Sequence, residues 1–233
     1  MNDQNEEKPY EKLKRLEEAL KLAKISGKNP DIFQALLNLG NFCYEIKANE
    51  LGLKYVNDAI ELSKESSTSQ NIYEFYKLLG DFNFELGSLD EAIEAYNISI
   101  KAIPKKESFK QLAQIYFKIG RIYFLQDNLK QAVNHFKKAE KIFEESGLYT
   151  EQAKICNQIG LMYIDKIPLS DLYEVENYMD DDAGGISSFK KAKKYYKKAK
   201  MILEKNNLKE TESELYNSIQ ANLTSKWKDF KET

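Results

Sequence analysis

Histidine and cysteine are almost absent from this chain. Its 233 residues include one histidine, His135, and two cysteines, Cys43 and Cys156. No Ser-His-Asp or Cys-His arrangement can be assembled from so few residues, and no glycine-rich phosphate loop is present. Closely spaced Cys and His ligands for a metal are missing as well. The sequence therefore predicts a protein that is not an enzyme and that has no metal and no cofactor.

Proline, glycine and long apolar runs are also scarce. Four prolines and ten glycines agree with a nearly all-helical fold. No apolar stretch approaches the roughly 20 residues that a membrane span needs. The polar residues 1–8 do not resemble a secretory signal, and we expect them to be disordered. These absences predict a cytoplasmic protein without a membrane partner.

Neither sign of charge dominates, since 35 basic side chains stand against 37 acidic ones. A dedicated nucleic-acid binder usually carries a basic excess, so we expect no nucleic acid partner. One segment departs from the balance, because seven lysines surround Tyr195 and Tyr196 within residues 190–200. This segment is either a patch for RNA or anionic lipid, or the solvated outer face of a helix. We favour the solvated face.

Glycine, although rare, recurs at a fixed interval of forty residues. Four glycines each have an apolar residue directly before them and another, usually bulky, four positions before them, as in Tyr116-x-x-Ile119-Gly120. Glycine inside a helix costs about 1 kcal/mol relative to alanine, so this pattern predicts a close neighbour at each position. The four glycines are Gly40, Gly80, Gly120 and Gly160.

A second pattern repeats in the other half of each interval. Twelve residues after the glycine comes a small residue, then a bulky one at +4 and a small one at +3, as in Ala132-Phe136-Ala139. The same triplets are Gly52-Val56-Ala59, Ala92-Tyr96-Ser99 and, after an insertion, Ala192-Tyr196-Ala199. A period of this length predicts a solenoid of paired helices.

Together the two halves resemble the tetratricopeptide repeat. Tyr123 and Tyr163 occupy the tyrosine position of that repeat, whereas Cys43 and Asn83 depart from it. The forty-residue spacing is similar to the long-helix variant of kinesin light chains, of polarity scaffolds that bind G-protein regulators, and of bacterial peptide-pheromone receptors. The resemblance covers residues 10–230 and implies an all-α fold, a right-handed superhelical solenoid.

The repeat and its helix signals predict ten helices in a single domain, residues 9–231. A lone helix of the second type comes first, with Leu16, Ala19 and Leu22 at the positions of Val56, Ala59 and Leu62. An acidic loop, residues 166–186, interrupts the fourth pair, and Asn207-x-x-Glu210 resembles a capping box that opens the closing helix. The expected helices are 9–26, 31–46, 50–64, 70–86, 89–102, 107–126, 129–145, 149–165, 187–205 and 208–230.

In tetratricopeptide solenoids the first helices of successive pairs line a concave groove. Residues at −6, −3, −2, +1 and +4 from each glycine face into that groove by helical spacing. They mix amides, cations and large apolar side chains, which suits an extended or helical peptide. The alternative is that some aromatic side chains pack between neighbouring pairs. The predicted binding residues are Gln34, Asn38, Asn41, Tyr44, Lys77, Asp81, Phe84, Gln114, Phe117, Lys118, Arg121, Lys154 and Asn157.

The resemblance also bears on the kind of ligand. Co-chaperones of this fold clamp a C-terminal carboxylate with Lys at −3 and Asn at +1 of the first repeat, but Leu37 stands at the lysine position. Asn38-Leu39-Gly40-Asn41 instead matches a motif of the polarity scaffolds, in which the asparagines contact the ligand backbone. We therefore expect a scaffold or adaptor, monomeric, that binds a partner peptide and is gated by its own acidic loop. The alternatives are a self-associating structural solenoid and a sensor of a signalling peptide.

Overall fold

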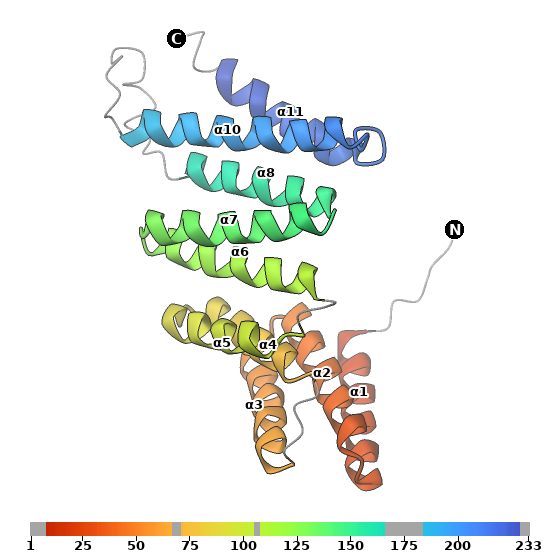
Figure 1. Cartoon of the computed structure of the whole chain (residues 1–233). Helices are drawn as coiled ribbons and strands as arrows, with labels where there is room; N and C mark the ends of the chain where they lie inside the picture. The colour runs from red at the N-terminus through yellow and green to blue at the C-terminus, as the bar shows by residue number, and fades with distance from the viewer. Residues whose placement is uncertain (1–7, 67–70, 105–107, 166–183, 229–233) are drawn as a thin grey trace. The chain divides into compact units, whose positions relative to one another are not determined.

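The computed structural model of this chain describes residues 8–66, 71–104, 108–165 and 184–228. Those residues form ten α-helices and no strand, which confirms the predicted all-α fold (Figure 1). Residues 1–7 and 166–183, on which the expected disordered start and the acidic gate fall, lie outside the described residues. Within the described ranges no helix is both long enough and apolar enough to cross a membrane.

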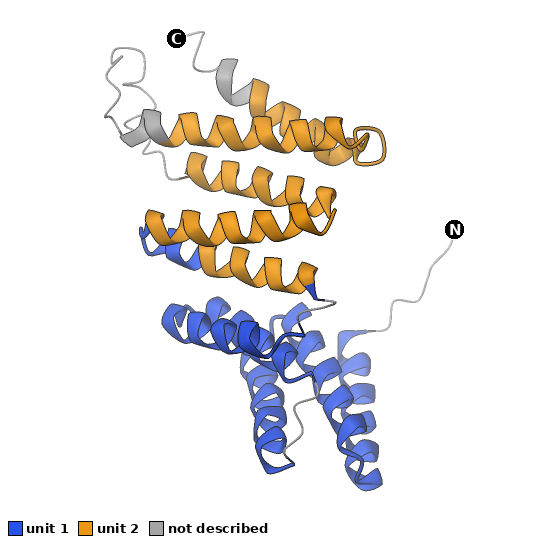
Figure 2. Ribbon diagram, in the orientation of Figure 1, with its two compact units in different colours: residues 1–108, 121–128 blue, residues 109–120, 129–233 orange. Residues whose placement is uncertain are grey.

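The helices divide into two compact units (Figure 2). Unit 1 comprises residues 1–108 and 121–128, and unit 2 comprises residues 109–120 and 129–233. Unit 1 contains α1 (Pro9–Ser26), α2 (Asn29–Glu45), α3 (Asn49–Glu65), α4 (Ile72–Glu85) and α5 (Leu89–Ala102). Helix α6 (Phe109–Leu125) contributes residues to both units. Unit 2 continues with α7 (Leu129–Glu145), α8 (Tyr149–Asp165), α10 (Gly184–Lys205) and α11 (Ser213–Lys228).

We call the helices that carry the repeated glycine inner helices (α2, α4, α6 and α8) and their partners outer helices (α3, α5, α7 and α10). The glycines lie where an aromatic ring of the outer helix packs against the inner helix. A Cβ added at Gly80, Gly120 or Gly160 would come within 2.5 Å of the ring of Tyr96, Phe136 or Tyr196, respectively. At Gly40 the outer residue is the smaller Val56, and an added Cβ would stand 3.4 Å from it. The close approach that the sequence predicts is therefore present.

The ends of the inner helices follow the same forty-residue interval. Lys47, Gly87 and Asp127 adopt positive φ values of 57°, 80° and 58° after α2, α4 and α6. In each case the N–H of the next residue donates to the carbonyl five residues earlier, over 2.8–2.9 Å. This is the Schellman arrangement, which satisfies backbone carbonyls that a helix end leaves without partners.

The expected start of the closing helix, at residue 208, is wrong because a Schellman arrangement occupies that position. Asn207 has a φ of 55°, and the N–H of Leu208 donates to the carbonyl of Leu203 over 2.8 Å. Asn207 therefore ends α10 and does not cap the next helix, whose N-cap would need a non-helical, usually extended, backbone. Helix α11 begins at Ser213 and not at residue 208, while α10 begins three residues earlier than expected, at Gly184.

Candidate functional site

Six of the predicted binding residues lie on the inner helices of unit 1 at matching repeat positions. We call the exposed or half-buried side chains among them, Asn41, Tyr44, Lys77, Phe84 and Arg121, the inner wall of unit 1. They come from three successive inner helices, α2, α4 and the last turn of α6. The sixth residue, Asp81, lies behind them, with 2% of its surface exposed.

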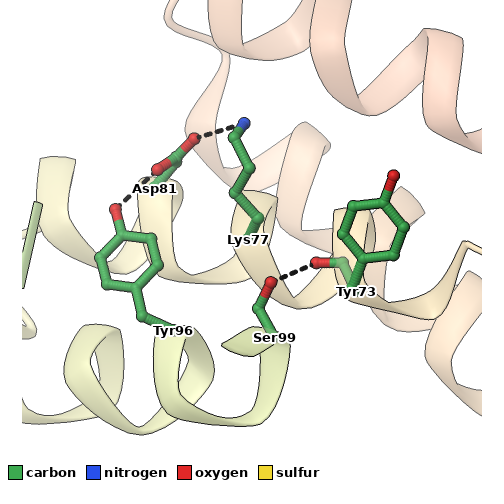
Figure 3. A network of polar contacts seen from close by, with 5 residues as sticks. All are labelled: Tyr73, Lys77, Asp81, Tyr96 and Ser99. Carbon is green, nitrogen blue, oxygen red and sulfur yellow. Dashed lines mark hydrogen bonds and ion pairs between the residues drawn. The ribbon is translucent and has the colours of Figure 1, made fainter. Parts of the chain in front are cut away.

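Asp81 is the centre of a polar network between α4 and α5 (Figure 3). The hydroxyl of Tyr96 donates to one carboxylate oxygen of Asp81 over 2.6 Å, and the ammonium of Lys77 pairs with the other at 3.2 Å. Close by, the hydroxyl of Ser99 donates to the backbone carbonyl of Tyr73 over 2.7 Å. A buried carboxylate needs such partners, so Asp81 fixes Lys77 in place and anchors α5 to α4.

Arg121 and Phe84 form the apolar and cationic part of the inner wall. The guanidinium carbon of Arg121 lies 5.2 Å from the centroid of the Phe84 ring, within cation–π range. Burial raises the pKa of the nearby Tyr44 hydroxyl, and the charges of Asp81 and Glu85 raise it further, while Arg121 opposes them. The Tyr44 ring also packs edge-on against Phe82, with centroids 5.6 Å apart. Tyr44 is therefore an ordered neutral hydroxyl between charges of both signs.

Two further predicted residues, Gln34 and Asn38, lie nearer the start of α2 than Asn41 and Tyr44. The side-chain amide of Gln34 donates to the oxygen of Asn38 over 3.0 Å, and both residues are exposed. They border a hollow of about 420 Å³ between α1 and α2. Its other lining residues are Ala19, Leu22, Ala23, Ser26, Asp31 and Ala35.

The remaining predicted residues belong to unit 2. Gln114 and Lys118 are half-buried on α6, and Lys154 is exposed on α8. Phe117 is 8% exposed and packs against Phe136 at 5.4 Å between centroids, while Asn157 is 8% exposed and accepts a hydrogen bond from Asn222 over 3.1 Å. Because Phe117 and Asn157 contact the chain itself, we leave both out of the proposed binding surface.

A second buried network lies in unit 2, and the repeat pattern did not predict it. Glu140, 7% exposed on α7, forms an ion pair with Lys198 of α10. The thiol of Cys156 lies 3.8 Å from the same carboxylate, and burial, then Glu140, raises the pKa of that thiol. Lys198 belongs to the lysine-rich segment, and its pairing favours the structural interpretation of that segment. Nothing in the repeat pattern distinguishes Glu140 from the exposed glutamates around it.

The described residues offer no arrangement for metal chemistry. No three His, Cys, Asp or Glu side chains among them are grouped as metal ligands. Both cysteines are buried free thiols. What the inner wall presents is instead an amide, a hydroxyl, two cations and an aromatic ring, groups that recognise a polypeptide by hydrogen bonds and charge.

Comparison with known proteins adds a family and a fold. A family model described as tetratricopeptide repeat matches residues 68–145. No curated protein sequence matches the chain. Among solved structures, BtubC (BKLC) from P. vanneervenii is similar with a TM-score of 0.59 and 11% identity, covering 96% of this chain and 91% of that one. The apo form of RapI has a TM-score of 0.59 and 19% identity, covering 97% and 79%.

A Rap protein complexed with Competence and Sporulation Factor is similar with a TM-score of 0.60 and 15% identity. The similarity covers 95% of this chain but 60% of that one, so this chain spans less than two thirds of that protein. At such identities the likeness concerns the fold, an all-α solenoid. The family model shows tetratricopeptide repeats at residues 68–145, and the solved structures share an all-α solenoid fold with this chain.

Proposed function

We propose that the chain is a non-catalytic scaffold that binds a peptide segment of a partner protein along the inner wall of unit 1. The observation that carries this proposal is the contact of Arg121 of α6 with the Phe84 ring of α4, beside Tyr44 of α2. Asn41 of α2 occupies the repeat position of Arg121. Solvated helix faces are usually rich in Glu and Lys, whereas these four side chains are an amide, a hydroxyl, a ring and a guanidinium.

The chemistry of the inner wall favours a particular ligand. A side-chain amide such as that of Asn41 can both donate to and accept from a peptide backbone. Arg121 can bind a carboxylate through two parallel hydrogen bonds, and the Phe84 ring beneath it can contact an apolar side chain. A segment with an acidic residue beside an apolar one therefore suits this surface.

The structural relatives support a peptide as the ligand. One Rap protein is solved with Competence and Sporulation Factor, and another Rap regulator, of plasmid pLS20, is solved with the Phr* peptide. Their identity to this chain is 15% and 16%, so we carry over the class of ligand and not its sequence.

Site-specific photocrosslinking locates the ligand. A photoreactive amino acid is placed at Asn41 on the inner wall, or at Asn97, an exposed asparagine of α5 that serves as the matched control. Irradiation in extract of the source cells, followed by mass spectrometry, should attach a partner segment at position 41 and not at 97. Equal or stronger crosslinking of that segment at position 97 would remove the inner wall from consideration.

A further inference from the structure

At the Ala19 position, helix α1 is exposed where the other outer helices are buried. In the repeat register Ala19 corresponds to Ala59, Ser99, Ala139 and Ala199, all of them 0% exposed. Ala19 itself is exposed, and Leu22 on the same face is 67% exposed. The buried face of α1 carries Leu20 and Ala23, which belong to the core that α2 shares. Among the described residues, no inner helix covers the Ala19 position of α1.

The hollow between α1 and α2 lies where the repeat would place an inner helix that packs on α1. Ala19 and Leu22 line it from α1, and Asn38 lines it from α2. Asn38 is the counterpart of Leu78, whose side chain packs on Gly40 of the preceding inner helix, 3.2 Å from the position of an added Cβ. The hollow is therefore the seat of an inner helix that would lie before α2.

Helix α11 is the mirror case, an inner helix that no outer helix covers among the described residues. Its sequence Tyr216-x-x-Ile219 repeats the frame Tyr116-x-x-Ile119 of α6. Tyr116 lies 5.9 Å from His135 of its own outer helix, between ring centroids. Leu223 likewise corresponds to Tyr163, which stacks at 6.0 Å on Tyr195 of α10. On α11 Leu223 is partly exposed, whereas Tyr163 is 3% exposed, and among the described residues no outer helix covers α11.

The residues at the centre of these two surfaces are complementary. Gln220 stands where the four inner helices have glycine, and its side-chain oxygen is buried with no hydrogen-bond partner among the described residues. The residue that would face it from α2 is Asn38, in place of the apolar Leu78. When the two surfaces are brought together, the amide of Gln220 lies against that of Asn38, as Gly40 lies against Leu78 within one chain. Leu16 occupies the repeat position at which three other outer helices have the bulky ring that requires glycine.

We propose that the chain associates head to tail, with α11 of one copy seated in the hollow between α1 and α2 of the next. The pair completes a repeat, with α11 as its inner helix and α1 as its outer helix. The contact joins two different surfaces, so each dimer keeps one free α1 face and one free α11 face and the assembly can grow. This inference is independent of the proposed peptide binding.

The concentration dependence of the molecular mass tests the association. Light scattering or sedimentation from micromolar to about 1 mM should show the mass of the wild type rising above that of one chain. Leu22→Glu should weaken association at least about tenfold, because it places a charge in the apolar contact. Ile25→Glu is the matched control, since Ile25 is 74% exposed on the same helix and corresponds to the charged residues Glu65, Glu145 and Lys205. A wild type that stays a single chain, or equal weakening by both variants, would overturn the proposal.

Mixing two variants tests the head-to-tail geometry. Leu22→Glu removes the α1 surface and Leu223→Glu removes the α11 surface, so each variant alone should be a single chain, while the mixture should form a dimer that grows no further. Association of Leu223→Glu with itself would instead indicate that two α1 faces meet, and would refute this geometry. Circular dichroism checks that α11 remains folded, and Gln220→Glu, which keeps the size of the side chain, replaces Leu223→Glu if it does not.

Discussion

At the scale of single residues, the fold depends on aromatic rings that lie against glycines. The sequence predicts a close neighbour at each of the four glycines, and the bulky residues of the second pattern are the neighbours. The contact is graded, because Val56 stands where the other pairs have Tyr96, Phe136 and Tyr196. Stability should follow that grading.

Gly120→Ala should destabilise the protein more than Gly40→Ala, whose Cβ would meet only the ends of side chains, Leu78 at 3.2 Å and Val56 at 3.4 Å. Alanine gains about 1 kcal/mol of helix propensity at either position. At Gly120 its Cβ would meet the Phe136 ring at 2.5 Å and the Ala132 carbonyl oxygen at 3.2 Å, and overpacking of this kind costs roughly 1–3 kcal/mol. Urea unfolding measures both variants. Equal free energies of unfolding for the two would show that the rings do not require the glycines.

Gly52→Ala offers a second test, because it restores the alanine that the other repeats have at this position. We expect it to destabilise unit 1, since the added Cβ would overlap the Cζ edge of the Phe82 ring. Combining it with Phe82→Leu should cost less than the sum of the two single changes, because the smaller side chain vacates that space. Additive free energies of unfolding would contradict this explanation of Gly52.

The two thiols should be unreactive in the folded protein. Burial, with a smaller contribution from Glu17, raises the pKa of Cys43 from 9.0 to about 11, and burial also raises that of Cys156. Since the thiolate is the reactive form, an aromatic disulfide reagent at pH 8 should label neither cysteine until urea unfolds the chain. Rapid labelling without urea would show that one of the thiols is accessible.

At the scale of helices, the sequence predicts most boundaries to within two residues. Helices α1, α5, α7 and α8 begin and end where the repeat and its turns place them. The start of α11 could not be predicted, because Asn207 satisfies the sequence pattern of an N-cap and the backbone preference of a helix end equally well. The backbone decides between the two, because Asn207 has a positive φ and the N–H of Leu208 donates to the carbonyl of Leu203 at the end of α10.

An ion pair joins helices α6 and α8 in unit 2 and should make stability depend on pH. Lys110 donates to Glu151 over 2.6 Å, and this hydrogen bond, against the effect of burial, lowers the pKa of the carboxyl below its ordinary 4.5. The contribution is therefore present above the unfolded-state pKa and is lost as the pH falls through the folded-state value. Lys110→Met should unfold more easily than the wild type above about pH 5, with the difference shrinking below pH ~4. A difference that stays constant across this range would exclude the pair as its cause.

At the scale of the whole molecule, the sequence predicts which helices carry the site better than which side chains form it. Helical spacing brings Asn41, Tyr44, Lys77, Phe84 and Arg121 to the inner wall, as exposed or half-buried side chains. The same spacing also selects Asp81 and Phe117, which are buried because Tyr96 and Phe136 cover them. Spacing fixes the direction of a side chain from its helix, but the size of its neighbours decides whether it reaches solvent.

We expect the inner wall of unit 1 to bind its partner segment through Arg121. Calorimetric titration of the segment identified by crosslinking measures this, with wild type, with Arg121→Glu and with Lys101→Glu. The control makes the same change of charge at an exposed position of the outer helix α5. Arg121→Glu should bind at least about tenfold more weakly, roughly 1.4 kcal/mol, with an unchanged melting temperature, while the control should bind like the wild type. Equal affinities for all three proteins would show that the inner wall is not the binding surface.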